Sequence, residues 1–77
     1  MIGVNDLICE YIYTNWIKSY KSQRAFADDH NIDESTVRKI KKSVVNGENY
    51  SIPVVTLNKI CEARSIKLSE FLNLMSL

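Results

Sequence analysis

Glycine, proline and cysteine are scarce in this chain. Of its 77 residues, two are glycine, one is proline and two are cysteine. Two separated glycines cannot form a glycine-rich phosphate loop of the kind found in nucleotide-binding enzymes. The longest apolar stretch falls far short of the roughly 20 residues that a membrane-spanning helix needs. The N-terminus also lacks a basic region followed by an unbroken apolar run, so we expect a cytoplasmic protein without a secretory signal.

The residues that carry most enzyme chemistry are equally sparse. Cys9 and Cys61 each sit in a helical apolar pattern, so we expect buried, reduced thiols in preference to a disulfide. The single histidine, His30, shares no metal-ligand spacing with either cysteine and suits the end of a helix. Neither a Ser/His/Asp set nor a carboxylate pair is present. We therefore expect no enzyme activity, no metal and no cofactor.

What the chain does have is enough apolar residues for one core and an uneven distribution of charge. Hydrophobic residues make up 45% of the sequence, which argues against disorder and predicts a single domain over residues 1–77. The net charge is only +1. Residues 18–42, however, hold seven basic and four acidic side chains, a local +3, while the remainder carries −2. A local basic surface is typical of nucleic-acid binding, and its location matters more than the total charge.

Residues 22–40 predict two short helices joined by a tight turn. Ser22 is a good N-cap for a helix of about two turns, and Asn31 suits the left-handed conformation that ends helices. Asp33 is expected to begin the next helix and to cap the amide of Ser35 or Thr36. Val37 and Ile40 would face Phe26 and Ala27, leaving Glu34, Ser35, Arg38 and Lys39 outside the core.

Three further helices are expected around this pair. The first would begin with Asn5 as N-cap and run to about Lys18, with Trp16 favoured as a core residue. Another would begin near Pro53, placed in its first turn, run to about Arg64, and bury the stripe Val54, Leu57, Ile60, Cys61 and Ala63. The last would hold Leu68, Phe71, Leu72 and Met75 on one side. The connection 43–52 could be a solvated loop or a phosphate-contacting wing carrying Asn46, Asn49 and Tyr50.

These elements together resemble the phage-repressor-like helix-turn-helix family, also called Cro-like or xenobiotic-response-element type. The matching residues are Ser22-Gln23, Phe26-Ala27, Asn31 with Ile32, Ser35-Thr36-Val37 with Ile40, then the runs 56–61 and 66–72. The resemblance covers roughly residues 8–72. It implies an all-α, compact bundle of five short helices with a central helix-turn-helix over residues 22–42. Lys41, where the family often has Glu, and the long connection to Leu57 are departures from the pattern.

The resemblance implies a sequence-specific binder of double-stranded DNA that inserts helix 33–43 into the major groove. The residues expected to contact bases are Gln23, Glu34, Ser35 and Lys39. The residues expected to contact phosphates are Ser22, Arg24, Arg38, Lys41, Lys42 and Asn46, with Lys21 a further possibility beside Arg24. Glu34 could instead only interact with the N-terminus of its own helix. The location implied is the cytoplasm of a bacterial or phage-infected cell.

The family's operators imply a homodimeric transcriptional regulator, with repression favoured over activation. The last helix is the expected dimer surface, with Leu68 and Leu72 pointing inward and Phe71, Met75 and Leu77 contacting the second copy. The alternative is an antitoxin-like protein-interaction module whose partner is a toxin and whose DNA binding is secondary or lost. A structural adaptor ranks third.

Overall fold

The computed structural model describes residues 3–75, and all of the regular secondary structure there is helical. Five α-helices follow one another along the chain: α1 (Val4–Asn15), α2 (Gln23–His30), α3 (Glu34–Val45), α4 (Val54–Ala63) and α5 (Leu68–Leu74). A 3₁₀ turn, η1 (Ile17–Ser19), separates α1 from α2, and no strand occurs between residues 3 and 75. The expected all-α bundle of five short helices is confirmed.

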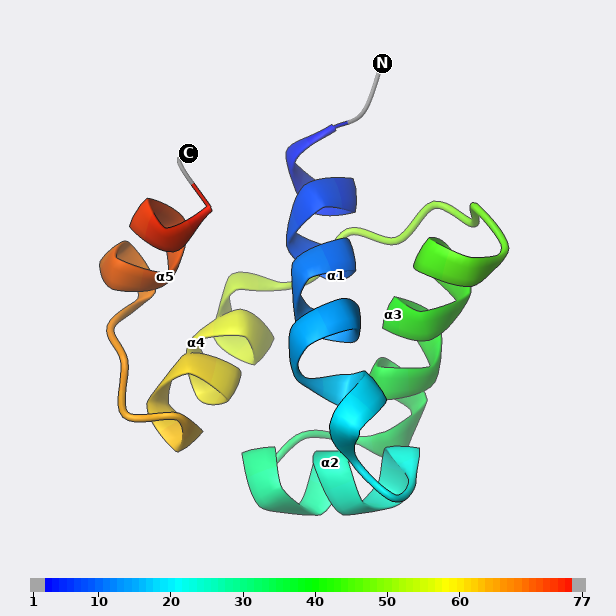
Figure 1. Ribbon diagram of the computed structural model, residues 1–77, viewed down its shortest axis with the longest axis horizontal. Helices are drawn as coiled ribbons and strands as arrows, with labels where there is room; N and C mark the ends of the chain where they lie inside the picture. The colour runs from blue at the N-terminus through cyan, green and yellow to red at the C-terminus, as the bar shows by residue number, and fades with distance from the viewer. Residues whose placement is uncertain (1–2, 76–77) are drawn as a thin grey trace.

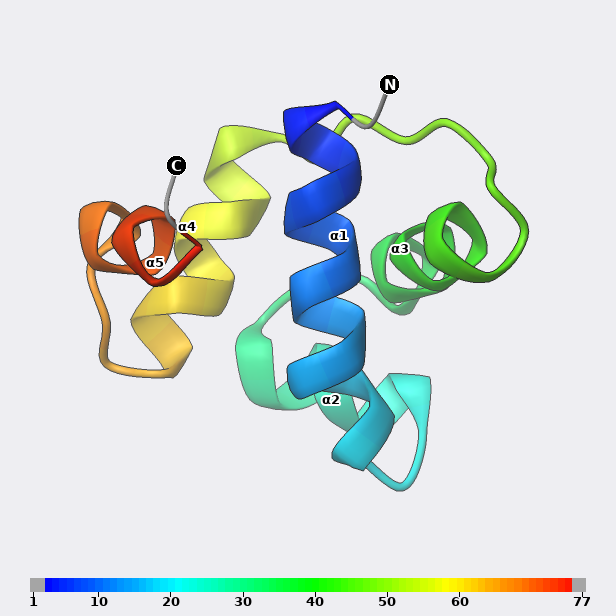
Figure 2. The same cartoon turned by 45° about the horizontal axis from the view of Figure 1, so that its top comes forward.

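Helix α1 stands in the middle of the molecule, with α3 on one side and α4 and α5 on the other (Figure 1). Helix α2 crosses below them and packs against both α3 and α4. The tilted view shows the segment after α3 passing the N-terminal end of α1 to reach α4 (Figure 2). The buried side chain of Ile52 and a hydrogen bond from its amide to Asn5 Oδ1, 3.3 Å long, fix this segment to α1.

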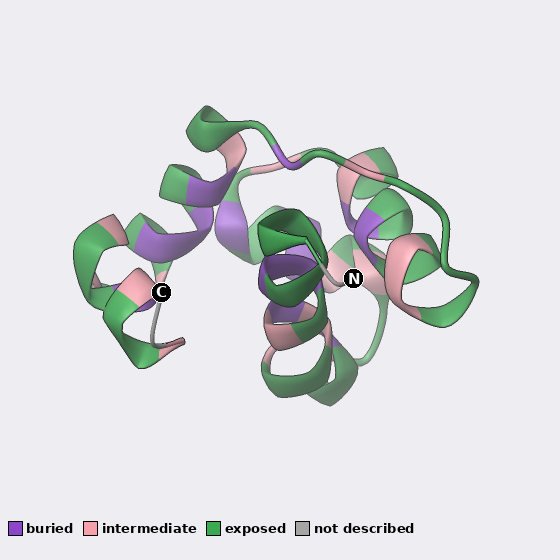
Figure 3. Ribbon diagram, turned by 90° about the horizontal axis from the view of Figure 1, so that it is seen from above, coloured by how far each residue is buried: buried purple, intermediate pink, exposed green. Residues whose placement is uncertain are grey.

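The core lies where α1 faces its neighbours, and the exposed positions form the outer sides of all five helices (Figure 3). Its fully enclosed side chains come from every helix: Cys9, Ile12, Phe26, Val37, Ile40, Ile60, Cys61 and Phe71. Both cysteines are free and buried, as expected, and burial raises the pKa of each thiol. Trp16 is half-buried against this core, with the Arg64 guanidinium 4.3 Å from the centre of its ring.

The pair α2 and α3 forms largely as the sequence predicts. Ser22 is extended and its Oγ accepts a hydrogen bond from the Ala25 amide at 3.1 Å. Asn31 has φ 56° and ψ 44°, and the following amide of Ile32 reaches back to the carbonyl of Ala27 at 3.0 Å. This is the left-handed ending expected of Asn31. Asp33 does precede α3, but its side chain makes no capping hydrogen bond, so that part of the prediction is wrong.

The two ends of α1 differ from expectation. Gly3, rather than Asn5, occupies the N-cap, and the carboxylate of Asp6 accepts a hydrogen bond from its amide at 3.1 Å. Asn5 lies inside the helix, where its side chain is free to bind Ile52. The α-helix ends at Asn15, short of the expected Lys18, because the chain tightens into η1 before turning toward α2. Similarly, Pro53 is the N-cap of α4 and not a first-turn residue.

Helices α4 and α5 contain the larger errors. Leu57, Ile60 and Cys61 are buried as predicted, but Val54 is 68% exposed and Ala63 is also exposed. Phe71 is fully buried, so the expectation that it faces a second copy is wrong. Its ring centroid lies 5.5 Å from that of Tyr11 and 5.3 Å from that of Trp16, because α5 uses this side chain to close the core over α1. Leu68, Leu72 and Met75 are half-buried, and Leu77 lies outside the described residues.

Candidate nucleic-acid interface

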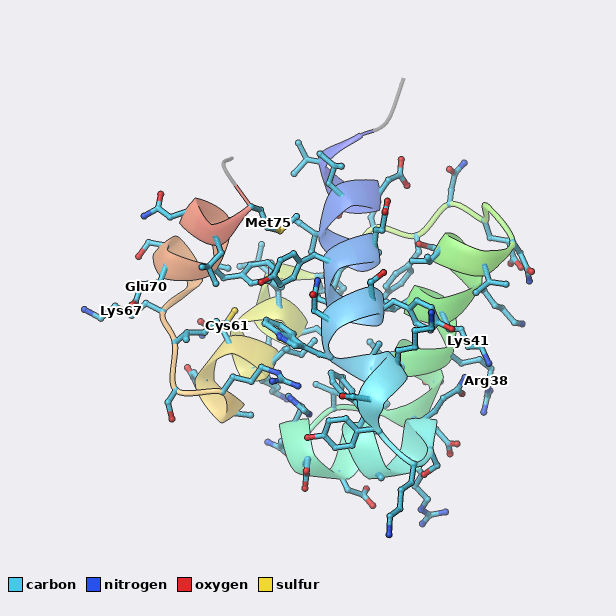
Figure 4. All side chains as sticks on the ribbon, viewed as in Figure 1. Arg38, Lys41, Cys61, Lys67, Glu70 and Met75 are labelled. Carbon is cyan, nitrogen blue, oxygen red and sulfur yellow. The ribbon has the colours of Figure 1, made fainter. Side chains whose placement is uncertain are left out.

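Helix α3 has two chemically different faces. Val37 and Ile40 are fully buried against the rest of the molecule. The opposite face is exposed and carries Glu34, Ser35, Arg38, Lys39, Lys41 and Lys42. Figure 4 shows Arg38 and Lys41 on this helix, across the molecule from Glu70 on α5 and from Lys67, the N-cap residue of α5. Four cations within one helix of 12 residues therefore lie on a single side of the protein.

The first turn of α3 presents the only acidic group of this face. Glu34 and Ser35 are both exposed there, in the residues directly after the N-cap Asp33. In a helix that inserts its N-terminal end into a major groove, short polar side chains of the first turn can contact base edges. The dipole of α3 also stabilises a carboxylate at this end. Both explanations for Glu34 that the sequence left open are compatible with its position.

A shallow concavity of about 200 Å³ lies at the beginning of α2. It brings together three of the predicted contact residues, Ser22, Gln23 and Lys41, although Lys41 belongs to α3. Lys18 and Lys21 line the same concavity and add two further cations. The amides at the N-terminus of α2 open beside them, an arrangement that favours an anion such as a phosphate. Arg24 is exposed on the next position of α2 but does not line this concavity.

Lys18 is the residue that sequence reasoning missed as a member of a site. It was counted in the basic segment together with Lys21, a possible phosphate contact, but no contact was assigned to Lys18. Lys18 lies in η1, and the sequence predicted a continuous α-helix at that point. The tighter turn changes the direction in which Lys18 leaves the backbone. The available signal was the spacing of two lysines directly before a predicted N-cap at Ser22.

A second concavity, of about 390 Å³, lies between α3 and the segment that follows it. Its lining residues are Lys39, Lys42, Glu48, Asn49 and Tyr50. The Lys39 ammonium lies 6.0 Å from the centre of the Tyr50 ring. Burial raises the pKa of Tyr50, and the Thr36 side chain, one turn before Lys39, has a smaller opposite effect. Tyr50 therefore lies beside the α3 side chains Thr36 and Lys39.

Asn46 is placed differently from the other predicted phosphate contacts. It forms the C-cap of α3, and its Nδ2 donates to Glu48 Oε2 at 3.2 Å. It lines neither of the two concavities. The predicted residues thus divide into one group beside α2, one group beside the segment 46–53, and the free face of α3 between them.

Between residues 3 and 75, no group of three or more His, Cys, Asp or Glu side chains is placed to hold a metal ion. None of the helices in that range has the length and apolar character needed to cross a membrane.

No protein-family model, no curated protein and no solved structure matches the chain.

Proposed function

We propose that the chain binds double-stranded DNA, with α2 and α3 acting as a helix-turn-helix and α3 entering the major groove. The observation that carries the proposal is the exposed face of α3, where Arg38, Lys39, Lys41 and Lys42 follow a polar first turn. A major groove accepts one α-helix, and cations along its sides neutralise the phosphates on both strands. The biological role that fits such binding is transcriptional regulation, with repression favoured.

The positions of the side chains on α2 and α3 indicate which of them would contact bases and which would contact phosphates. Glu34 and Ser35 in the first turn of α3, with Gln23 beginning α2, would contact base edges. Arg38 and Lys42, with the concavity lined by Ser22 and Lys41, would contact phosphates. Lys39 lies between these groups, since it belongs to the exposed face while its ammonium is near Tyr50.

The direct test is selection of binding sites from random duplex DNA, followed by affinity measurements at several salt concentrations. We expect a defined consensus and a strong salt dependence. Lys42→Ala should weaken all sequences alike and reduce the salt slope by about one. Lys67→Ala, on the other side of the molecule, is the control and should bind like the wild type (Figure 4). Recovery of no consensus, together with no salt-dependent binding, would disprove the proposal.

A homodimer belongs to the same proposal, because two half-sites one helical turn apart require two copies of so small a domain. The available surface is the groove between α1 and α5, about 270 Å³, which Leu7, Tyr11 and Met75 line on their exposed sides. Figure 4 shows Met75 at the boundary between these two helices. Leu74, 61% exposed, adds apolar surface on α5 but does not line this groove. Sedimentation of the protein with and without its selected DNA tests this assembly, and a monomer in both conditions would contradict it.

Exposed apolar side chains outside this groove support the second candidate, a protein-interaction module of the antitoxin kind. Val4 and Leu74 are 58% and 61% exposed, and apolar surface of this type marks binding sites for proteins. The two candidates differ in what Leu74→Glu does. In the regulator it should weaken DNA binding through loss of the dimer, whereas in the interaction module it should abolish partner binding and leave any DNA binding unchanged.

A further inference from the structure

The segment 46–53 has a defined path along the molecule. Gly47 has φ 71°, a left-handed conformation that suits glycine, and the next amide, that of Glu48, lies 3.5 Å from the carbonyl of Lys42. At the other end, Ile52 is only 7% exposed and its amide binds Asn5 of α1. Tyr50 lies between these two fixed points. The loop is therefore anchored on both sides of the residue that meets Lys39.

Lys39 lies at the edge of the exposed face of α3 that is closest to this loop. Thr36, Lys39 and Lys42 follow at three-residue steps, so they form one row along the helix. The Thr36 side chain lowers the pKa of Tyr50 against the larger effect of burial, the Lys39 ammonium lies 6.0 Å from the ring centre, and Lys42 lines the same concavity. All three members of the row thus face the loop.

We propose that Tyr50 is a positioning residue that holds Lys39 toward the loop, so that Lys39 and Lys42 together bind a DNA phosphate. The face of an aromatic ring attracts an ammonium group through its quadrupole. A lysine side chain held in this way loses less rotamer freedom when it binds an anion. The inference rests on the proposed DNA binding, and it replaces the expectation from the sequence that Lys39 contacts a base edge.

The remaining polar groups of the concavity are consistent with one bound phosphate. The amide of the Asn49 side chain can donate a hydrogen bond to a phosphate oxygen. Glu48 opposes the anion, but Asn46 Nδ2 donates to its carboxylate. With two lysines against one carboxylate, the lining retains a net positive charge. A phosphate is therefore favoured there over a cation.

The experiment is a double-mutant cycle on the salt dependence of DNA affinity. Wild type, Lys39→Ala, Tyr50→Leu and the double variant are measured on the selected site and on random duplex DNA of equal length. Lys39→Ala should reduce the salt slope by about one and weaken both DNAs equally. Tyr50→Leu should weaken both DNAs about two- to fivefold, and this loss should disappear when Lys39 is already alanine.

Tyr50→Phe is the matched control, since it keeps the ring and removes only the hydroxyl. We expect it to bind like the wild type, with thermal melts confirming that every variant is folded. A shift in base preference in Lys39→Ala, with an unchanged salt slope, would overturn this inference and leave the proposed DNA binding intact. Additive losses in the cycle would likewise overturn it. Absence of wild-type binding to any DNA would disprove the proposed function and the inference together.

Discussion

The pair α2 and α3 and the pair α4 and α5 are similar in size, yet their sequences define them to very different degrees. In the first pair, Phe26, Val37 and Ile40 are buried as their spacing predicts. In the second, Val54 is exposed where a core position was expected, and Phe71 is buried where an exposed one was expected. The first pair alternates apolar with charged residues. Helix α5 is apolar on several sides, so its periodicity cannot indicate which side faces the core.

The largest effect expected from this comparison is that of a charge at Phe71. Phe71→Glu places a carboxylate between Tyr11 and Trp16, at a position with no exposed surface, where desolvation of the charge is costly. Removal of the ring alone costs about 3–5 kcal/mol, a large part of the free energy of unfolding of a small domain. We therefore expect the variant to be unfolded or close to it in a urea or thermal melt.

Leu74→Glu is the matched control on the same helix. Leu74 is 61% exposed, so its substitution should change the free energy of unfolding by no more than about 0.5 kcal/mol. A folded Phe71→Glu protein with a stability close to that of Leu74→Glu would show that α5 is rotated relative to the structure.

The contacts that could not be predicted join residues far apart in the chain. The hydrogen bond from Ile52 to Asn5 spans 47 residues, and Tyr50 meets α3 only because that anchor directs the loop. Caps and turns act over three or four residues, so Ser22 and Asn31 could be identified from their neighbours alone. The same limit explains the candidate site. The sequence indicates which face of α3 is exposed, but the approach of Lys41 to Ser22 and of Lys39 to Tyr50 depends on packing.

The next largest effect concerns the two non-glycine residues with positive φ among the described residues, one in each pair of helices. Asn31 has φ 56° after α2, and Ser65 has φ 59° after α4. A left-handed conformation costs an L-residue about 1–2 kcal/mol, and a β-branched side chain resists it most. Asn31→Val and Ser65→Val should each lower the free energy of unfolding by at least about 1–2 kcal/mol. Glycine at either position should leave the free energy of unfolding unchanged or raise it. Thermal melts of the four variants test this. A tolerated valine at one site would show that its turn has another conformation.

The stability of the first pair should also depend on pH through His30. Burial lowers the pKa of His30, and the positive charge of Arg64 lowers it further, outweighing the hydrogen bond of its ring with the Phe26 carbonyl and the carboxylate of Asp29. Below about pH 6.5 the unfolded chain then binds a proton that the folded protein binds less readily. The free energy of unfolding should therefore fall as the pH decreases from 6.5 toward the lowered pKa, and level off below it.

Urea melts between pH 7.5 and 5 measure this dependence. His30→Gln is the comparison, because it keeps a neutral donor near Phe26 and cannot titrate. The variant should lose most of the slope in this range, since His30 is the single histidine of the chain. An equal slope in both proteins would assign the pH dependence to other groups.

The smallest expected effect separates the two N-caps of the first pair. Ser22 Oγ accepts the Ala25 amide at 3.1 Å, whereas Asp33 makes no such bond and acts only through its charge at the positive end of α3. Ser22→Ala should therefore cost about 1 kcal/mol, and Asp33→Asn, which removes the charge but keeps a capping side chain, no more than about 0.5 kcal/mol. The cost for Asp33 should also decrease at high salt, because a charge–dipole interaction is screened and the Ser22 hydrogen bond is not. Denaturant melts of the Ser22→Ala and Asp33→Asn variants at low and high salt measure both losses in the free energy of unfolding. An Asp33→Asn loss equal to that of Ser22→Ala and independent of salt would show that Asp33 caps α3 through a hydrogen bond in solution.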